Sequence, residues 1–350
     1  MKRPLSPAMQ IELSQLRDLT TRVGSDPSLT QASTGNSSAK LDGEFWIKRS
    51  GQWMSAAMRE EIFIRLDLAE VTDCLRLGLD PAAFFDGASL ETAMHAAMPH
   101  RAVIHVHSVN TIAWAVRADG LSQIQARLTG LRWQWIPYLP SGLPLARGIE
   151  RAGRRRPDTD LFVLANHGLV VGGKDVQEVE ALLTEVHRRL HISPRVAPPA
   201  DHANLRAIAA NSNWKLPDDD EIHALATDPL SQRIVSRGIL YPCQAIFSGS
   251  PGSEAFRPVP RGMHREYGDR PFLLIDGCGV VVNRTASPAA IAMLAGLARV
   301  VRRIGASAPT RYLTDEEVAG VSPEVADRYR ELAHAGSAPA DGSRMHESWR

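Results

Sequence analysis

Residues 102–108 read AVIHVHS, and residues 161–173 read LFVLANHGLVVGG. Each segment is an apolar, β-branched run typical of a buried strand, broken by histidine where packing alone would favour valine or leucine. Side chains at i and i+2 of a strand point to the same face, so His105 and His107 can reach one cation. Imidazole suits zinc and similar divalent ions, and a catalytic zinc typically has three protein ligands. His167 is the natural third ligand.

The alternative is that each histidine is an ordinary hydrogen-bonded residue of the core or surface, which is the usual situation for a lone histidine. An HxH pair at a strand end is weak support by itself. Together with a further histidine inside a second apolar segment, it favours the metal site.

The rest of the first half alternates predicted helices with predicted strands. An Asp-Gly pair at residues 42–43, between two short runs, predicts a β-hairpin. Apolar residues at helical spacing predict an opening amphipathic helix that ends at Gly24, and Asp175 predicts the cap of a later helix. The expected helices are residues 7–23, 55–77, 89–98 and 175–190, and the expected strands are residues 102–106, 133–138 and 161–171. This half is therefore predicted to be a mixed α/β unit.

A proline-rich stretch divides the chain. Residues 193–201 read SPRVAPPAD, and proline cannot continue a helix and favours an extended linker. We therefore expect two regions, residues 7–195 and residues 202–334. The polar, small-residue tail at 335–350 is expected to be disordered.

The second region contains a stretch that parallels the first. Residues 270–304 follow the pattern of residues 159–190, with an apolar strand, a central glycine, a valine pair and a helix. Cys278 falls opposite His167, so this copy lacks the imidazole. Two interpretations stay open: a degenerate repeat, or two unrelated strand–helix units that look alike.

Composition narrows the class of protein. Apolar residues make up 44% and charged residues 23%, as in ordinary globular proteins. A formal net charge of +1 favours neither nucleic acid nor an anionic membrane, so a small-molecule partner is expected. Cys74, Cys243 and Cys278 are an odd number without metal-site spacing, which fits a reducing compartment. Without a secretory signal or membrane-length apolar window, the protein is expected in the cytoplasm.

The segments GNSSAKL, IKRSG, ASLETAMH, VIHVHS and LANHGLVVGG follow one another within residues 35–173. In this order they resemble the successive motifs of the class II aldolase/adducin family, and the resemblance covers about residues 10–195. It implies a three-layer α/β/α domain over residues 7–195 that binds metal and carries catalysis. A smaller α/β region of unknown role over residues 202–334 follows, as in a longer branch of the family.

The resemblance also implies roles for particular residues. One divalent cation is expected, zinc first, with manganese, cobalt or iron as alternatives. Leu90 stands where the family usually has a second serine before the glutamate. The metal ligands implied are His105, His107 and His167, the acid/base is Glu91, and the substrate- or phosphate-binding residues are Asn36, Ser50, Gly51 and Ser89.

The implied reaction is cleavage or formation of a carbon–carbon bond in a ketose, a ketose phosphate or a related sugar derivative. A cation that binds substrate oxygens stabilises the enediolate left when such a bond breaks. The same chemistry serves decarboxylases, epimerases and dehydratases, and an adducin-like module without catalysis is a further alternative. The family also implies a homo-oligomer, a tetramer by resemblance.

Overall fold

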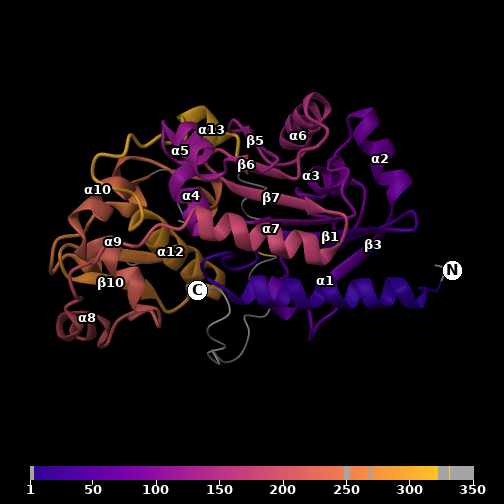
Figure 1. Cartoon of the computed structure of the whole chain (residues 1–350). Helices are drawn as coiled ribbons and strands as arrows, with labels where there is room; N and C mark the ends of the chain where they lie inside the picture. Colours follow the sequence, from indigo (N-terminus) through magenta and orange to yellow (C-terminus); the bar gives the residue numbers. More distant parts are fainter. Residues whose placement is uncertain (1–3, 248–252, 268–269, 322–330, 332–350) are drawn as a thin grey trace.

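In the computed structural model of the chain, the described residues form two β-sheets (Figure 1). It describes residues 4–247, 253–267, 270–321 and 331. The first sheet has seven strands in the order β3-β2-β1-β4-β7-β6-β5, and the second has three in the order β8-β10-β9. Strands β5 and β6 run parallel, and the other paired strands of the described residues run antiparallel. The strands are β1 (Asn36–Leu41), β2 (Glu44–Lys48), β3 (Phe63–Asp67), β4 (Ala102–Val106), β5 (Trp133–Ile136), β6 (Leu161–Leu164), β7 (Gly168–Gly173), β8 (Trp214–Lys215), β9 (Phe272–Ile275) and β10 (Gly279–Asn283).

Helices cover both faces of the seven-stranded sheet. Alternate residues of a strand point to opposite faces, so Ile104 of β4 packs among residues of α1 (Pro7–Ser25) and α7 (Val176–Arg189). Val103 packs on the other face, among residues of α3 (Thr92–Ala97) and α6 (Leu143–Arg155). The expected three-layer α/β/α arrangement is confirmed. His105, two residues after Val103, lies on the face of α3 and α6.

The remaining helical elements complete the two halves. The remaining α-helices are α2 (Leu68–Leu77), α4 (Val109–Ala115), α5 (Gly120–Arg127), α8 (His202–Ala209), α9 (Ala224–Thr227), α10 (Pro229–Arg237), α11 (Pro242–Phe247), α12 (Pro288–Val301) and α13 (Asp315–Ala319). The 3-10 turns are η1 (Met54–Ala56), η2 (Pro81–Ala83), η3 (Asp220–His223), η4 (Ser253–Phe256) and η5 (His264–Tyr267). The region after residue 202 is thus a smaller α/β part, as expected.

Two local predictions, one of a turn and one of a helix cap, are confirmed. The hairpin between β1 and β2 is confirmed, with φ of 48° at Asp42 and 83° at Gly43. The cap of α7 is confirmed as well, because the Asp175 carboxylate accepts a hydrogen bond from the Glu178 amide at 2.8 Å.

Three expectations for the first half are wrong. Residues 55–77 are not one helix but η1, β3 and α2, because Ile62, Phe63 and Ile64 are buried in succession, which a two-faced strand allows. Helix α1 continues through Gly24, where an added Cβ would lie 2.3 Å from the Ser55 nitrogen, so this glycine serves close packing. Residues 161–171 are not one strand but the hairpin of β6 and β7.

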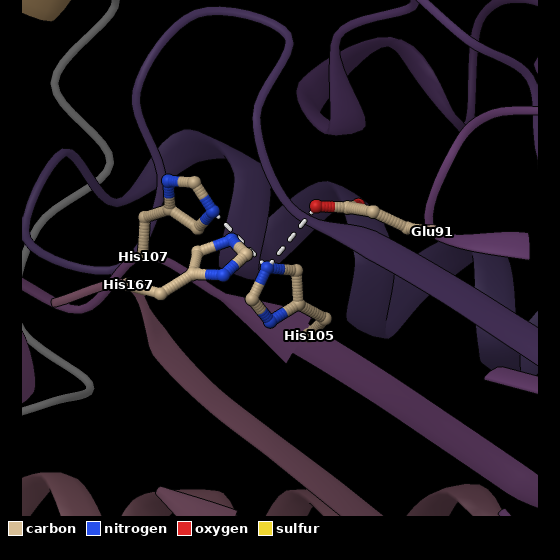
Figure 2. A group of neighbouring side chains, drawn as sticks. All are labelled: Glu91, His105, His107 and His167. Atoms are coloured by element: carbon tan, nitrogen blue, oxygen red, sulfur yellow. Dashed lines mark hydrogen bonds and ion pairs between the residues drawn. The ribbon is translucent and has the colours of Figure 1, made fainter. Parts of the chain in front are cut away.

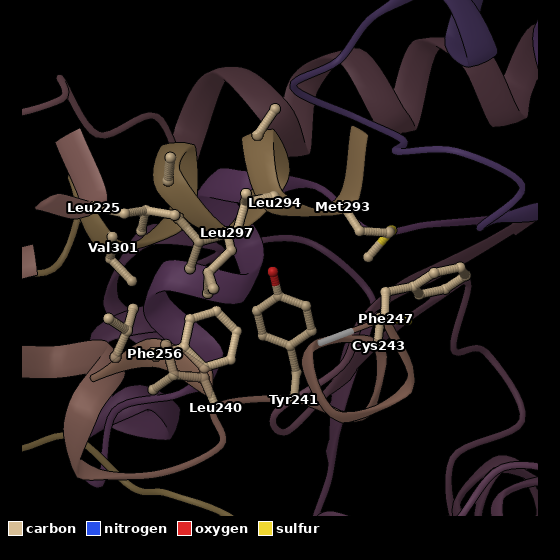
Figure 3. Packing of buried hydrophobic residues seen from close by; sticks show 14 of the residues in the cluster. Leu225, Leu240, Tyr241, Cys243, Phe247, Phe256, Met293, Leu294, Leu297 and Val301 are labelled. Carbon is tan, nitrogen blue, oxygen red and sulfur yellow. The ribbon is translucent and has the colours of Figure 1, made fainter. Parts of the chain in front are cut away.

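The C-terminal half packs directly on the helix that follows His107. Val109 and Ile112 of α4 belong to the same buried cluster as Leu225, Tyr241 and Leu297 (Figure 3 shows the last three). Residues 191–201 contain no helix or strand, in keeping with an extended linker. Because the two halves share a core, the division of the chain at this linker stays a prediction.

None of the helices described is both long and apolar enough to span a bilayer. The tail at 335–350, predicted to be disordered, lies outside the described residues.

Candidate metal centre

Four side chains that could ligate a cation lie together at one end of the first sheet (Figure 2). They are Glu91, His105, His107 and His167, and one nitrogen or oxygen of each lies within 4.8 Å of the others. Nε2 of His105 is 3.0 Å from Nε2 of His107 and 3.2 Å from Oε1 of Glu91. The ring centroid of His167 is 5.0 Å from each of the other two rings. The structure thus brings together the four residues that the sequence singles out, and all are buried.

The ends of secondary-structure elements place these side chains. His105 is on β4 and His107 lies just beyond it, before α4. His167 is the last residue of the turn between β6 and β7, next to β4 in the sheet. A Cβ at Gly168 would lie 2.4 Å from the carbonyl oxygen of Val106, so only glycine lets this turn approach β4 so closely.

Glu91 and Ser89 precede α3 rather than standing on it. The helix begins at Thr92, and Glu91 is its N-cap residue. The expectation that a helix opened by Ser89 carries Glu91 is therefore wrong in detail. The short loop before α3 leaves the Glu91 carboxylate pointing toward the imidazoles (Figure 2).

The ring of His105 is oriented by the backbone. Its Nδ1 is 2.9 Å from the carbonyl oxygen of Leu169. A carbonyl only accepts, so Nδ1 carries the proton, and the lone pair of Nε2 is directed into the cluster. Such an outer hydrogen bond is the usual partner of a metal-binding histidine, because it fixes the tautomer.

Burial and charge set the protonation of the cluster. Burial lowers the pKa of His167 to about 3 and holds the pKa of His107 well below its usual value, so both rings are neutral at pH 7. Burial raises the pKa of Glu91, whereas positive charge at the neighbouring rings, His105 foremost, lowers it. Protons on His107 and His167 do not supply that charge at pH 7, whereas a bound cation would.

The donor set fits a divalent metal ion. Nitrogen ligands about 2.0–2.1 Å from a tetrahedral zinc lie about 3.3 Å from one another. The separations of 3.0 and 3.2 Å around Nε2 of His105 are close to this value. The cluster could therefore hold a divalent cation, and the identity of the ion follows from neither the ligands nor their spacing.

The four residues expected to bind substrate or phosphate also come together. Nδ2 of Asn36 donates to Oγ of Ser89 at 3.0 Å, and Oδ1 of Asn36 is buried without a hydrogen-bond partner among the described residues. Gly51 has a φ of 75°, a conformation that favours glycine. One cavity is lined by Asn36, Ser50, Gly51 and Ser89 together with Glu91, His107 and His167.

Several residues of this cavity were not anticipated as site residues. Lys48 is buried, and its ammonium donates to the carbonyl oxygens of Gln52 at 2.7 Å and Ser33 at 3.1 Å. Burial lowers its pKa to about 8, opposed by the Glu91 carboxylate. Its place in the segment IKRSG was an available signal. From more distant parts of the chain come Tyr138, Pro242, Cys243, Phe247 and Val321, for which the sequence offered none.

A second group of potential ligands does not fit a metal. His202, Asp220 and His223 bring ligand atoms within 4.8 Å of one another. Nδ1 of His223 accepts a hydrogen bond from the Val280 amide at 3.0 Å, so the proton of the neutral ring is on Nε2. Neither nitrogen then has a lone pair to offer a cation.

Fold and cluster together define an α/β protein with a buried His/Glu centre that opens on a small-molecule cavity. The family model described as the Class II Aldolase and Adducin N-terminal domain matches residues 16–193, half of the chain. The chain therefore belongs to the class II aldolase/adducin family.

The individual proteins that the chain resembles have low sequence identity to it. The uncharacterized oxidoreductase YuxG of Bacillus subtilis (strain 168) is 27% identical over 174 residues, covering 43% of this chain and 25% of that protein. The chain thus spans about a quarter of the length of that relative.

Two solved structures are similar over about half of this chain. The N-terminal class II aldolase domain of a conserved protein from Thermoplasma acidophilum is 20% identical, with a TM-score of 0.46, over 54% of this chain and 97% of that one. The L-fuculose-1-phosphate aldolase of Thermus thermophilus is 17% identical, with a TM-score of 0.39, over 52% of this chain and 93% of that one.

Proposed function

We propose that the chain is a metal-dependent lyase that cleaves or forms a carbon–carbon bond in a ketose, a ketose phosphate or a related sugar derivative. One observation carries the proposal. The cavity is lined by a carboxylate and two imidazoles of the His/Glu centre and also by the small polar residues expected to bind substrate. A reacting carbon and a polar or phosphorylated end could therefore be held at the same time.

Each group of residues in the site has its own chemical role. A cation held by His105, His107 and His167 supplies Lewis acidity, which stabilises negative charge that develops on substrate oxygens. Beside a bound cation the Glu91 carboxylate would be ionised, so it could begin as a base that takes a proton from the substrate and later returns it. Asn36 offers a buried acceptor, Oδ1, to a substrate hydroxyl.

The cavity has the size expected of a small-molecule site. Its volume is about 160 Å³, similar to that of a cavity that holds one small molecule.

The first test is metal content. The purified protein should carry about one divalent ion per chain, and His105→Ala should lose it while circular dichroism stays that of the parent. An equal metal content in the variant and the parent would show that His105 is not part of a metal site. Zinc as the preferred ion, and a homo-oligomer measured by light scattering, are parts of the same proposal.

The second test is turnover. Ketose phosphates and oxo-acids are screened for aldol cleavage, decarboxylation, epimerisation and dehydration, each with and without chelator. Glu91→Gln should keep the metal and lose about 10²–10⁴-fold in rate. Asp73→Asn, an exposed carboxylate of α2, is the matched control and should keep full activity. Full activity of Glu91→Gln would end the role proposed for Glu91, and no metal-dependent turnover of any kind would favour a binding module.

A further inference from the structure

The C-terminal half reaches the metal centre at two of its three histidines. Cys243 of α11 is the first contact, with Sγ 3.6 Å from Nδ1 of His107. Nδ1 lies across the ring from Nε2, the nitrogen that faces His105. The sulfur therefore stands behind His107, in the position of an outer partner rather than a ligand.

Asn166, the residue before His167, makes the second contact. It is fully buried and has a φ of 52°, a conformation that costs energy for a residue other than glycine. Its amide donates to the carbonyl oxygens of Leu240 at 2.8 Å and Arg311 at 3.0 Å. Its Oδ1 accepts from the Arg311 guanidinium at 2.7 Å. The three hydrogen bonds that this side chain makes within the described residues all go to the C-terminal half.

Metal coordination would require a hydrogen-bond acceptor behind each imidazole ring. A neutral imidazole that offers the Nε2 lone pair to a cation must carry its proton on Nδ1, and that proton needs an acceptor. For His105 the acceptor is the Leu169 carbonyl, and for His107 the atom in reach is Cys243 Sγ. Outer partners of this kind orient the ring and raise metal affinity.

The hydrogen bonds of Asn166 act on the backbone. A left-handed residue persists where the surrounding structure over-determines it. Three bonds from Leu240 and Arg311 do so here, and the turn they fix is the one that presents His167.

We propose that the C-terminal half is a positioning element of the metal centre. Cys243 orients the ring of His107, and Leu240 and Arg311 hold Asn166 so that His167 faces the other two rings. This inference rests on the proposed metal-binding function and gives the C-terminal half a role in it.

The test uses the full-length protein and Co²⁺ as the probe, because the visible absorption of bound Co²⁺ reports its coordination geometry. Cys243→Ala and Asn166→Gly should each weaken Co²⁺ binding about 10–100-fold and change the spectrum. Glycine keeps the left-handed conformation at 166, so the variant removes only the side-chain bonds. Cys243→Ser, whose hydroxyl can accept the same proton, should recover part of the affinity.

Cys278→Ala is the matched control, because Cys278 is buried in an apolar cluster of the C-terminal half. It should leave both affinity and spectrum unchanged. Parent affinity and spectrum in Cys243→Ala and Asn166→Gly would overturn the inference while leaving the site intact. If His105→Ala binds Co²⁺ like the parent, the proposed metal site fails instead. Should Asn166→Gly not fold, Arg311→Ala tests the same turn through the loss of one bond.

Discussion

Two hairpins of this molecule have similar turns and different chemistry. Strands β6 and β7 are joined by residues 165–167, and strands β9 and β10 by residues 276–278. The middle residue of each turn is left-handed, with φ of 52° at Asn166 and 59° at Gly277. A 14-residue helix follows each hairpin, and the strand orders β4-β7-β6 and β8-β10-β9 correspond. At the last turn position stands His167 in one hairpin and Cys278 in the other.

The strand beside each hairpin makes the difference. Strand β4 pairs with β7 as far as Val106 and Leu169, so His105 and His107 reach the turn. Strand β8 has two residues and pairs with β10 at Val282 and Asn283, far from the turn. In the second hairpin no residue of β8 reaches the position that corresponds to the end of β4. There Nδ1 of His223 accepts a hydrogen bond from the Val280 amide instead. The hairpin supplies only one of the three clustered imidazoles, and the neighbouring strand and the residue after it supply the other two.

The largest effect is expected from His167→Ala. Removing one of three ligands should cost more metal affinity than the roughly 10–100-fold lost with an outer partner. Cys278→Ala, the same position of the other hairpin, should leave metal content unchanged. Elemental analysis of both purified variants measures the contrast. Retained metal in His167→Ala would mean that the two hairpins do not differ in function.

This comparison also shows what sequence alone could supply. The HxH strand, the Asp-Gly hairpin and the Asp175 cap were predictable because each depends on neighbouring residues. The strand β3 was missed because its pattern of burial is set by β2, against which it pairs. Cys243 was missed as a site residue because it lies 136 residues from His107, and only the packing of α4 against the C-terminal half brings them together. The roles of the three histidines and of Glu91 stay predictions until metal is measured.

The next largest effect is expected from substituting the glycines that begin β7 and β10. A Cβ at Gly168 would lie 2.4 Å from a backbone oxygen of β4, and one at Gly279 would lie 2.8 Å from the Leu205 side chain. Each alanine variant should lose about 1–3 kcal/mol of unfolding free energy in urea, as overpacked sites do, and Gly279→Ala adds backbone strain because Gly279 has a φ of 143°. Gly168→Ala should also weaken metal binding, because the displaced strand carries His105 and leads directly into His107. Unaltered metal affinity in Gly168→Ala would contradict the close fit of the turn against β4.

The left-handed turn residues offer a smaller and more selective test. Gly277→Ala should cost about 1–2 kcal/mol, since an L-residue is strained there and the nearest atom to its Cβ would be 4.0 Å away. Gly277→Asn, which copies the residue of the first hairpin, should cost less than about 1 kcal/mol, because asparagine tolerates this conformation. Equal losses in the two variants would show that the cost is not backbone strain.

The smallest effect is a pH dependence that belongs to the second hairpin. Burial, aided by His202 and opposed by Asp220 and Asp219, lowers the pKa of His223. An unfolded chain takes up a proton at this histidine as the pH falls through about 6.5. The folded protein resists that proton, so the unfolded state binds more protons and the folded state loses stability below that pH. His223→Asn keeps an acceptor near the Val280 amide without titrating, so its urea midpoint should fall less than the parent's between pH 7 and pH 5. Equal falls of the urea midpoint in the two proteins would mean that titration of His223 does not contribute to this pH dependence. As a control, metal affinity at pH 7 should be the same in both proteins.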